Sequence, residues 1–165
     1  DGKGKPRGIL SYADGKEWGS IEQIGSAKAG AITADSLMNL FYSLKEAYAT
    51  KAKFLMSRAA IQSVRMLKDA SSGHYIWQPS LAAGTPDTLL GSEVKQSADM
   101  PGLIKDSLAV AFGDFKSAYQ IFDRQSIKIL RDPFTNKPFV KFYATKRVGG
   151  DVVNFEALRL LKLSA

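Results

Sequence analysis

An α+β fold, with one central mixed β-sheet flanked by two helices, is predicted by three features of this sequence. Two segments, at 34–48 and 58–68, carry apolar residues at helical spacing. Most of the remaining chain has short apolar or alternating runs that are typical of strands. The chain has 165 residues, which suits one domain, or one domain and a small appendage, with its own core, and it contains no internal repeat.

The first half of the chain predicts both helices. Residues 1–32 are rich in Gly, Ser and Lys and predict a loop-rich segment with one or two short strands. Capping residues at 33–36 begin a helix, and Ser57 caps a second helix after a buried strand at 53–56. One apolar face of the first helix holds Leu37, Leu40, Phe41, Leu44 and Tyr48, and the second helix points Ala60, Ile61, Val64 and Leu67 inward.

The second half predicts mostly strands. Residues 89–95 fit a strand that is interrupted at Gly91, and 157–163 fits a strand although its spacing also satisfies a helix. Loops are expected at 78–87 and 97–105, and turns at 69–73 and 149–151, around a short extended segment at 74–77. Four further strands are expected, at 108–112, 119–123, 126–130 and 139–147, with a connection at 124–125.

The chain is basic, with 23 Lys and Arg against 16 Asp and Glu, a formal net charge of +7 and a pI of about 9.6. Nine basic and three acidic residues lie within 124–162. These bases alternate with apolar residues, as in half-buried strands with one wet face. A solvated surface and a nucleic-acid-binding surface both fit this charge. The aromatic residues at 139–143 fit a base-stacking platform or a core strand, and their alternation favours the core.

Little in the sequence indicates catalysis or metal binding. The absence of cysteine excludes disulfides, thiol nucleophiles and zinc fingers. His74, the one histidine, has no general-base partner nearby in sequence, so a packing or surface role fits it better. The glycine-rich segment at 2–8 lacks the Ser or Thr of a phosphate loop, and the scattered aspartates match turns. The sequence contains no run of about 18 apolar residues, so it predicts no membrane-spanning helix. We therefore predict no enzyme activity, no cofactor, no metal and no membrane partner.

Six stretches, in matching order, resemble the major capsid protein family of tailed bacteriophages, which has the HK-ninety-seven-type or Johnson fold. Two of them are Gly73-His-Tyr-Ile-Trp-Gln-Pro79 and Ala111-Phe-Gly-Asp-Phe115. The other four stretches are residues 1–10, residues 34–35 together with 54–69, residues 89–91 together with 93–94, and residues 147–162 at the end. Together they extend over essentially the whole chain.

The resemblance implies an axial-type capsid domain over residues 1–165, with a strand at 138–148 shared with the peripheral domain of the family. The N-terminal arm, extended loop and spine helix of the family would precede residue 1. The missing start methionine agrees with a piece cut from a longer subunit. Such a fragment is expected to expose apolar surface and to be monomeric or weakly associated.

The implied function is that of a structural subunit of a phage or prophage icosahedral capsid, assembled in the bacterial cytoplasm. It would associate with copies of itself as pentamers and hexamers and enclose DNA. Subunit contacts are expected on loops, at Pro79, Pro86, Asp87, Asp99 and Pro101. Non-specific contacts to packaged DNA are expected from Lys128, Arg131, Lys141, Lys146 and Arg147. The alternative is a sequence-independent nucleic-acid-binding module that uses the basic 124–162 stretch.

Overall fold

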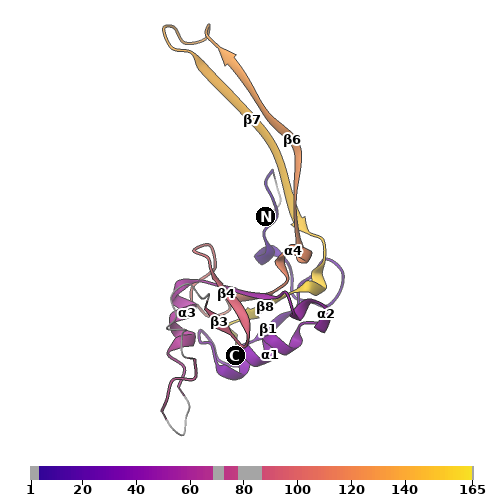
Figure 1. Ribbon diagram of the computed structural model, residues 1–165, viewed down its shortest axis with the longest axis vertical. Coiled ribbons are helices and arrows are strands. Elements are labelled where there is room, and N and C mark those ends of the chain that lie inside the picture. The colour runs from indigo at the N-terminus through magenta and orange to yellow at the C-terminus, as the bar shows by residue number, and fades with distance from the viewer. Residues whose placement is uncertain (1–3, 69–72, 78–86, 165) are drawn as a thin grey trace. The chain divides into compact units, whose positions relative to one another are not determined.

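The structure is a computed structural model that describes residues 4–68, 73–77 and 87–164 (Figure 1). Its chain separates into two compact units. Residues 12–118 and 153–165 form the larger one, here called the sheet unit, and residues 1–11 and 119–152 form the ribbon unit. The separation follows from strand pairing, because the two strands within 119–152 pair only with each other among the residues that the structure describes.

The sheet unit contains a six-stranded mixed sheet, which confirms the predicted fold class. Its strand order is β1-β8-β5-β2-β4-β3, with parallel pairs β1–β8 and β2–β4 and antiparallel pairs elsewhere. The strands are β1 (Gln23–Gly25), β2 (Lys53–Met56), β3 (Thr88–Leu89), β4 (Ser92–Gln96), β5 (Leu108–Gly113) and β8 (Leu158–Lys162). The final segment is therefore a strand, as expected. It lies between two other strands with Leu158, Leu160 and Leu161 fully buried, and burial on both faces explains its non-alternating sequence.

The two expected helices are present as α1 (Ala34–Ser43) and α3 (Arg58–Arg65). Their capping is as predicted, since the backbone N–H of Ser36 donates to Thr33 Oγ1 and that of Ala60 donates to Ser57 Oγ. The first helix was expected to reach residue 48, and this is wrong. Leu44 has an extended backbone with ψ of 139°, which ends α1 and turns the chain into α2 (Glu46–Ala49). The described residues also form a short helix, α4 (Phe115–Ala118), and two 3-10 turns, η1 (Ile9–Ser11) and η2 (Phe155–Ala157).

The core lies where α1 and α3 meet one face of the sheet. The rings of Phe54 on β2 and Phe112 on β5 stack with centroids 4.3 Å apart, and both are fully buried. Leu40 of α1 and Val64 of α3 belong to the same buried cluster. This agrees with the inward positions that helical spacing predicts.

The segment 89–95 is a hairpin and not one interrupted strand. Leu90 and Gly91 have φ of 51° and 80°, and they form the two-residue connection between the antiparallel strands β3 and β4. Two successive positive φ values are typical of the tight turns that match strand twist. Leucine rarely adopts this conformation, so the sequence reveals only the glycine.

The ribbon unit holds β6 (Tyr119–Asp132) and β7 (Lys141–Val152), which pair antiparallel (Figure 1). The predicted connection at 124–125 lies inside β6, where the register shifts twice between Asp123 and Lys128. The predicted turn at 149–151 lies inside β7. The expectation of half-buried strands is also wrong here, because Phe142 and Tyr143 are 67% and 66% exposed. The alternating residue types lie on the two faces of the ribbon, and neither face packs against a core within the described residues.

Asp114 controls the turn that leads out of β5. Its carboxylate accepts hydrogen bonds from the Ser117 hydroxyl at 2.6 Å and from the Lys116 N–H at 3.1 Å. Burial alone would raise the pKa of Asp114. The bonds from the Ser117 side chain and from the Ser117 and Lys116 backbone, with the charge of Lys51, outweigh burial and hold that pKa below its usual value.

Replacing Asp114 with asparagine is expected to lower the free energy of unfolding by about 1 kcal/mol at neutral pH, because charge-assisted hydrogen bonds to the carboxylate become weaker neutral ones. A lowered folded-state pKa stabilises the fold above the unfolded-state pKa, and this contribution disappears as pH falls through the folded-state value. The difference between wild type and Asp114→Asn should therefore shrink between neutral pH and about pH 3. Urea titrations at both pH values measure it, and an unchanged difference would contradict the assigned hydrogen bonds.

Candidate assembly and anion-binding surfaces

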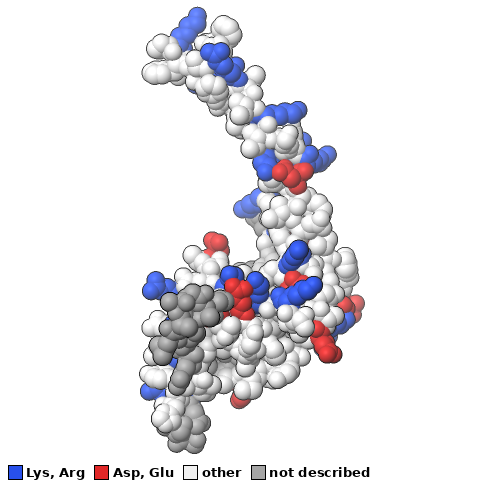
Figure 2. Space-filling model, viewed as in Figure 1, with Lys and Arg blue, Asp and Glu red and all other residues white. Residues whose placement is uncertain are grey.

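The strand register of the ribbon unit assigns each side chain to one of two faces. Residues paired across strands share a face, and successive residues alternate. One face, here called the cationic face, contains the pairs Gln125–Arg147, Lys128–Thr145, Leu130–Tyr143 and Asp132–Lys141. The other, here called the apolar face, contains Ile121–Gly150, Asp123–Val148, Ile129–Ala144 and Arg131–Phe142. Figure 2 shows Lys and Arg side chains at several levels along the ribbon.

The five candidate DNA-facing bases are divided between these faces. Lys128, Lys141 and Arg147 lie together on the cationic face, whereas Arg131 and Lys146 belong to the apolar face. Lys146 is also paired, since its Nζ lies 2.8 Å from Asp123 Oδ2. The assignment of all five to DNA stays a prediction, but only three of them can contact one ligand on one face.

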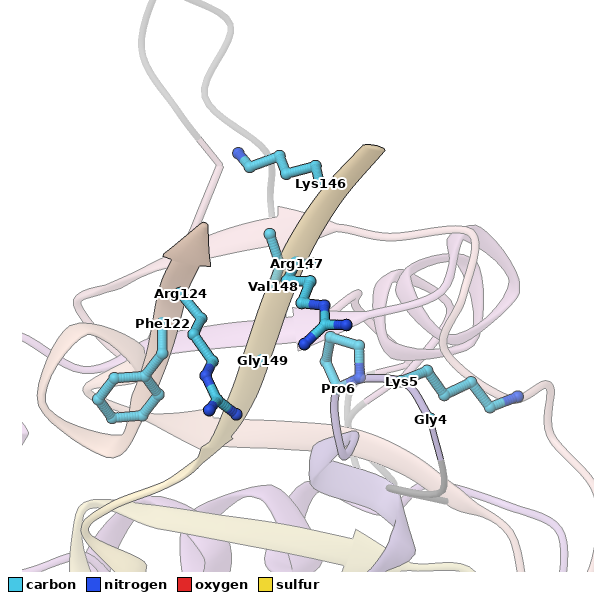
Figure 3. A pocket seen from close by; sticks show the side chains of 9 residues that line it. All are labelled: Gly4, Lys5, Pro6, Phe122, Arg124, Lys146, Arg147, Val148 and Gly149. Carbon is cyan, nitrogen blue, oxygen red and sulfur yellow. The ribbon is translucent and has the colours of Figure 1, made fainter. Parts of the chain in front are cut away.

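A pocket opens at the Gly149 end of the ribbon unit, with a volume of about 660 Å³. Figure 3 shows Arg124 extending from β6 and Arg147 from β7 toward this end, whereas Lys146 points away from them. The lining residues are Gly4, Lys5, Pro6, Phe122, Arg124, Lys146, Arg147, Val148 and Gly149. Arg124 was missed as a candidate because it lies at a register shift, where simple alternation no longer predicts the direction of a side chain.

The N-terminal segment of the ribbon unit is fixed beside β7 by two hydrogen bonds. The Arg7 N–H donates to the Gly150 carbonyl and the Tyr119 hydroxyl donates to the Arg7 carbonyl, both at 2.9 Å. A Cβ atom at Gly150 would lie 2.5 Å from the Tyr119 hydroxyl, so glycine permits this close packing. These contacts hold the chain next to Gly4, Lys5 and Pro6, which line the pocket.

The candidate subunit-contact loops are only partly described, since Pro79 and Pro86 lie outside the described residues. Asp87 is not a free loop tip, because its carboxylate lies 2.5 Å from Arg65 and its carbonyl accepts the Val94 N–H at 2.8 Å. Asp99 is exposed, and the Pro101 carbonyl accepts a hydrogen bond from Ser57. Their role between subunits stays a prediction.

The sheet unit exposes apolar side chains around a small hollow between α1, α3 and β3. The hollow has a volume of about 50 Å³, and it is lined by Ala34, Leu37, Met38, Val64, Leu67, Ile76, Trp77, Leu89 and Leu90. Trp77, which lines the hollow, is held by two contacts. The Arg65 guanidinium lies 5.1 Å from its ring centroid, and its indole N–H donates to the Thr88 carbonyl at 2.8 Å. This surface offers an apolar contact for another protein surface.

The described residues contain no group of three or more His, Cys, Asp or Glu side chains that could hold a metal ion. His74 is exposed. Within the described part of the chain, no helix has both the length and the apolar character needed to cross a membrane.

The comparisons with known proteins agree with this fold. A family model described as the phage capsid family matches residues 1–163. The capsid of an empty GTA particle, computed with C5 symmetry, is 42% identical with a TM-score of 0.87 over 100% of this chain and 58% of that chain. The capsid of a native GTA particle is 40% identical with a TM-score of 0.79 over 98% of this chain and 54% of that chain. No curated protein matches.

A structure from Gordonia phage Cozz shares the fold, with 15% identity and a TM-score of 0.56 over 98% of this chain and 55% of that chain. The family match and the GTA capsid structures, together with the fold, define a structural protein of the capsid type. The chain belongs to the phage capsid family, which confirms the family that the sequence resembles. It spans 58% of the length of the capsid protein of the empty GTA particle.

Proposed function

We propose that this chain is part of a subunit of an icosahedral phage, prophage or GTA-like capsid, and that the subunit assembles into pentamers and hexamers that enclose DNA. The observation that carries the proposal is the match to GTA capsids at 42% identity and a TM-score of 0.87 over the whole chain. The relevant location would be the capsid of the particle, after assembly in the bacterial cytoplasm.

The ribbon supports a subunit larger than this chain. Its apolar face exposes Ile121, Ile129 and Phe142, with each side chain about two-thirds or more exposed. Large apolar side chains that stay exposed on one face of a ribbon are typical of an interaction surface. We assign the ribbon to the peripheral domain and the sheet unit to the axial domain, and we assign the cover of the apolar face to parts of the subunit outside this chain.

The apolar hollow of the sheet unit supports contacts between copies. In a cyclic ring each subunit presents one surface to a different surface of its neighbour, so a small apolar recess can receive an apolar side chain repeatedly around the ring. Met38 and Leu90 line the recess and are themselves partly exposed. The loop around Asp99 and Pro101 would take part in the same ring.

Electron microscopy of the full-length subunit that contains this chain, expressed alone or with its scaffold, tests the proposal. Closed shells built of five- and six-membered rings are the expected result. An absence of both shells and rings would contradict it. Sedimentation of the 165-residue chain provides the matched comparison, with a monomer or weak association expected and a stable closed ring of five or six copies as the contrary outcome.

A further inference from the structure

We propose that the pocket built on Arg124 and Arg147 binds the phosphodiester backbone of duplex DNA, and that Lys128 and Lys141 extend this contact along the cationic face. The inference rests on the proposed function only in taking enclosed DNA as the natural ligand. Its physical basis is a set of charges that the ribbon gathers on one side.

The pocket has two guanidinium groups and no opposing carboxylate. Among the described residues, neither Arg124 nor Arg147 forms an ion pair, and the described lining contains no Asp or Glu. Guanidinium groups bind phosphate oxygens through paired, charge-assisted hydrogen bonds. A DNA backbone whose phosphates enter this pocket can contact both arginines without displacing an ion-pair partner of either.

The pocket also has room at its centre. Gly149 is paired with Phe122 on the cationic face, and a Cβ atom at Gly149 would meet nothing within 4 Å. The backbone of β7 is therefore open to a ligand at this position. A larger residue at 149 would occupy the space without changing any charge.

The cations continue away from the pocket along one face. Arg147 and Lys141 are six residues apart on β7, or about 20 Å at the usual strand rise of about 3.3 Å per residue. Lys128 is paired with Thr145 between them. Phosphates follow one another at about 3.4 Å along each DNA strand, so a backbone that lies on this face meets several cations in succession.

The carboxylates of this face are engaged within the ribbon unit. Asp132 accepts the Phe134 N–H at 2.9 Å and also accepts bonds from Thr135. Asp151 accepts the Val152 N–H at 2.9 Å. An acidic peptide segment is the competing ligand. The arginine pocket alone would be enough to bind one of its carboxylates, whereas a row of cations along the face matches the regularly spaced charges of a DNA backbone.

The test measures binding of a mixed-sequence 24-base-pair duplex (roughly 80 Å long) to the 165-residue chain by fluorescence anisotropy across a salt series. The double variant Arg124→Gln/Arg147→Gln should lower the salt slope of log K by about 1.8, or about 0.9 for each lost phosphate contact, and weaken binding roughly tenfold. Gly149→Leu should weaken binding several-fold with the charge unchanged. Lys128→Gln and Lys141→Gln should each lower the slope by about 0.9.

The matched control is Arg58→Gln/Lys116→Gln, which removes the same charge from the sheet unit and should leave the slope unchanged. Circular dichroism verifies folding of each variant, and Arg124→Lys/Arg147→Lys should retain the slope. A nucleic acid analogue with an uncharged backbone should not bind. Equal effects in the pocket and control variants would overturn the proposal, as would binding of polyglutamate, but not of DNA, that depends on Arg124 and Arg147.

The two proposals fail separately. If the full-length double variant forms normal shells while the DNA slope is unchanged, the phosphate site is wrong and the capsid function stands. If the wild-type subunit forms no shells, the capsid proposal fails whatever the DNA titration shows.

Discussion

Replacing Gly113 with alanine is expected to lower the free energy of unfolding of the sheet unit by about 3 kcal/mol. A Cβ atom at this position would lie 2.2 Å from the Ala157 carbonyl oxygen and 2.9 Å from the Leu158 Cα atom. Both are backbone atoms of the neighbouring strand region, so no side-chain rotation can relieve the overlap. The substitution must separate β5 from the start of β8 in the middle of the sheet.

The separation would also affect the hydrogen bond from the Asp114 N–H to the Ala157 carbonyl, which is 3.0 Å long. Urea unfolding followed by circular dichroism measures the effect. Gly102→Ala is the matched control, since a Cβ atom there meets nothing within 4 Å, and it should change stability by less than about 0.5 kcal/mol. Equal unfolding midpoints for the two variants would contradict the close approach of the strands.

Replacing Arg159 with methionine is the second large effect, with an expected loss of about 3 kcal/mol. The Arg159 side chain is 9% exposed, and its Nε lies 3.0 Å from Glu22 Oε2. Its Nη1 donates to the Leu158 carbonyl at 2.9 Å and to the Glu156 carbonyl at 3.3 Å. Methionine fills a similar volume, but it leaves the Glu22 carboxylate without its buried counter-ion and both carbonyls without their donor.

Glu22→Gln provides the comparison for this ion pair. Glu22 also lies 3.2 Å from Lys16 Nζ, so its loss removes charge while the guanidinium keeps its backbone acceptors. We expect Glu22→Gln to cost about 1 kcal/mol, clearly less than Arg159→Met. A double-mutant cycle of the two positions measures their coupling, and full additivity would show that the Glu22–Arg159 pair contributes nothing.

Helix positions were predictable because their causes are local. Thr33 and Ser57 each supply a capping oxygen within three residues of the group they bind, and the spacing of Leu37, Leu40 and Val64 defines a buried stripe. The end of α1 at Ser43 was not predictable, because Leu44 and Tyr48 pack against the core on both sides of a break. Burial continues there although the helix does not.

For the ribbon, the sequence predicted the extended backbone but not what surrounds it. Alternation along 119–147 correctly indicated extended chain, but the pattern is the same whether one face meets a core or both faces meet solvent. The sequence likewise identified the candidate basic residues only as one basic stretch, without assigning them to a face. Cross-strand register places Lys128 and Arg147 on one face and Arg131 on the other, and the shift near Asp123 makes Arg124 part of the pocket.

The basic, cysteine-free sequence by itself determined the α+β class, the helix starts, most strand segments and the resemblance to capsid proteins, because these depend on residue type and short-range spacing. Only the tertiary structure decided that the strands form a six-stranded sheet and a separate ribbon, and which cations share a face. Pairing partners and register depend on contacts between residues far apart in the chain, and a shift of one residue moves a side chain to the opposite face.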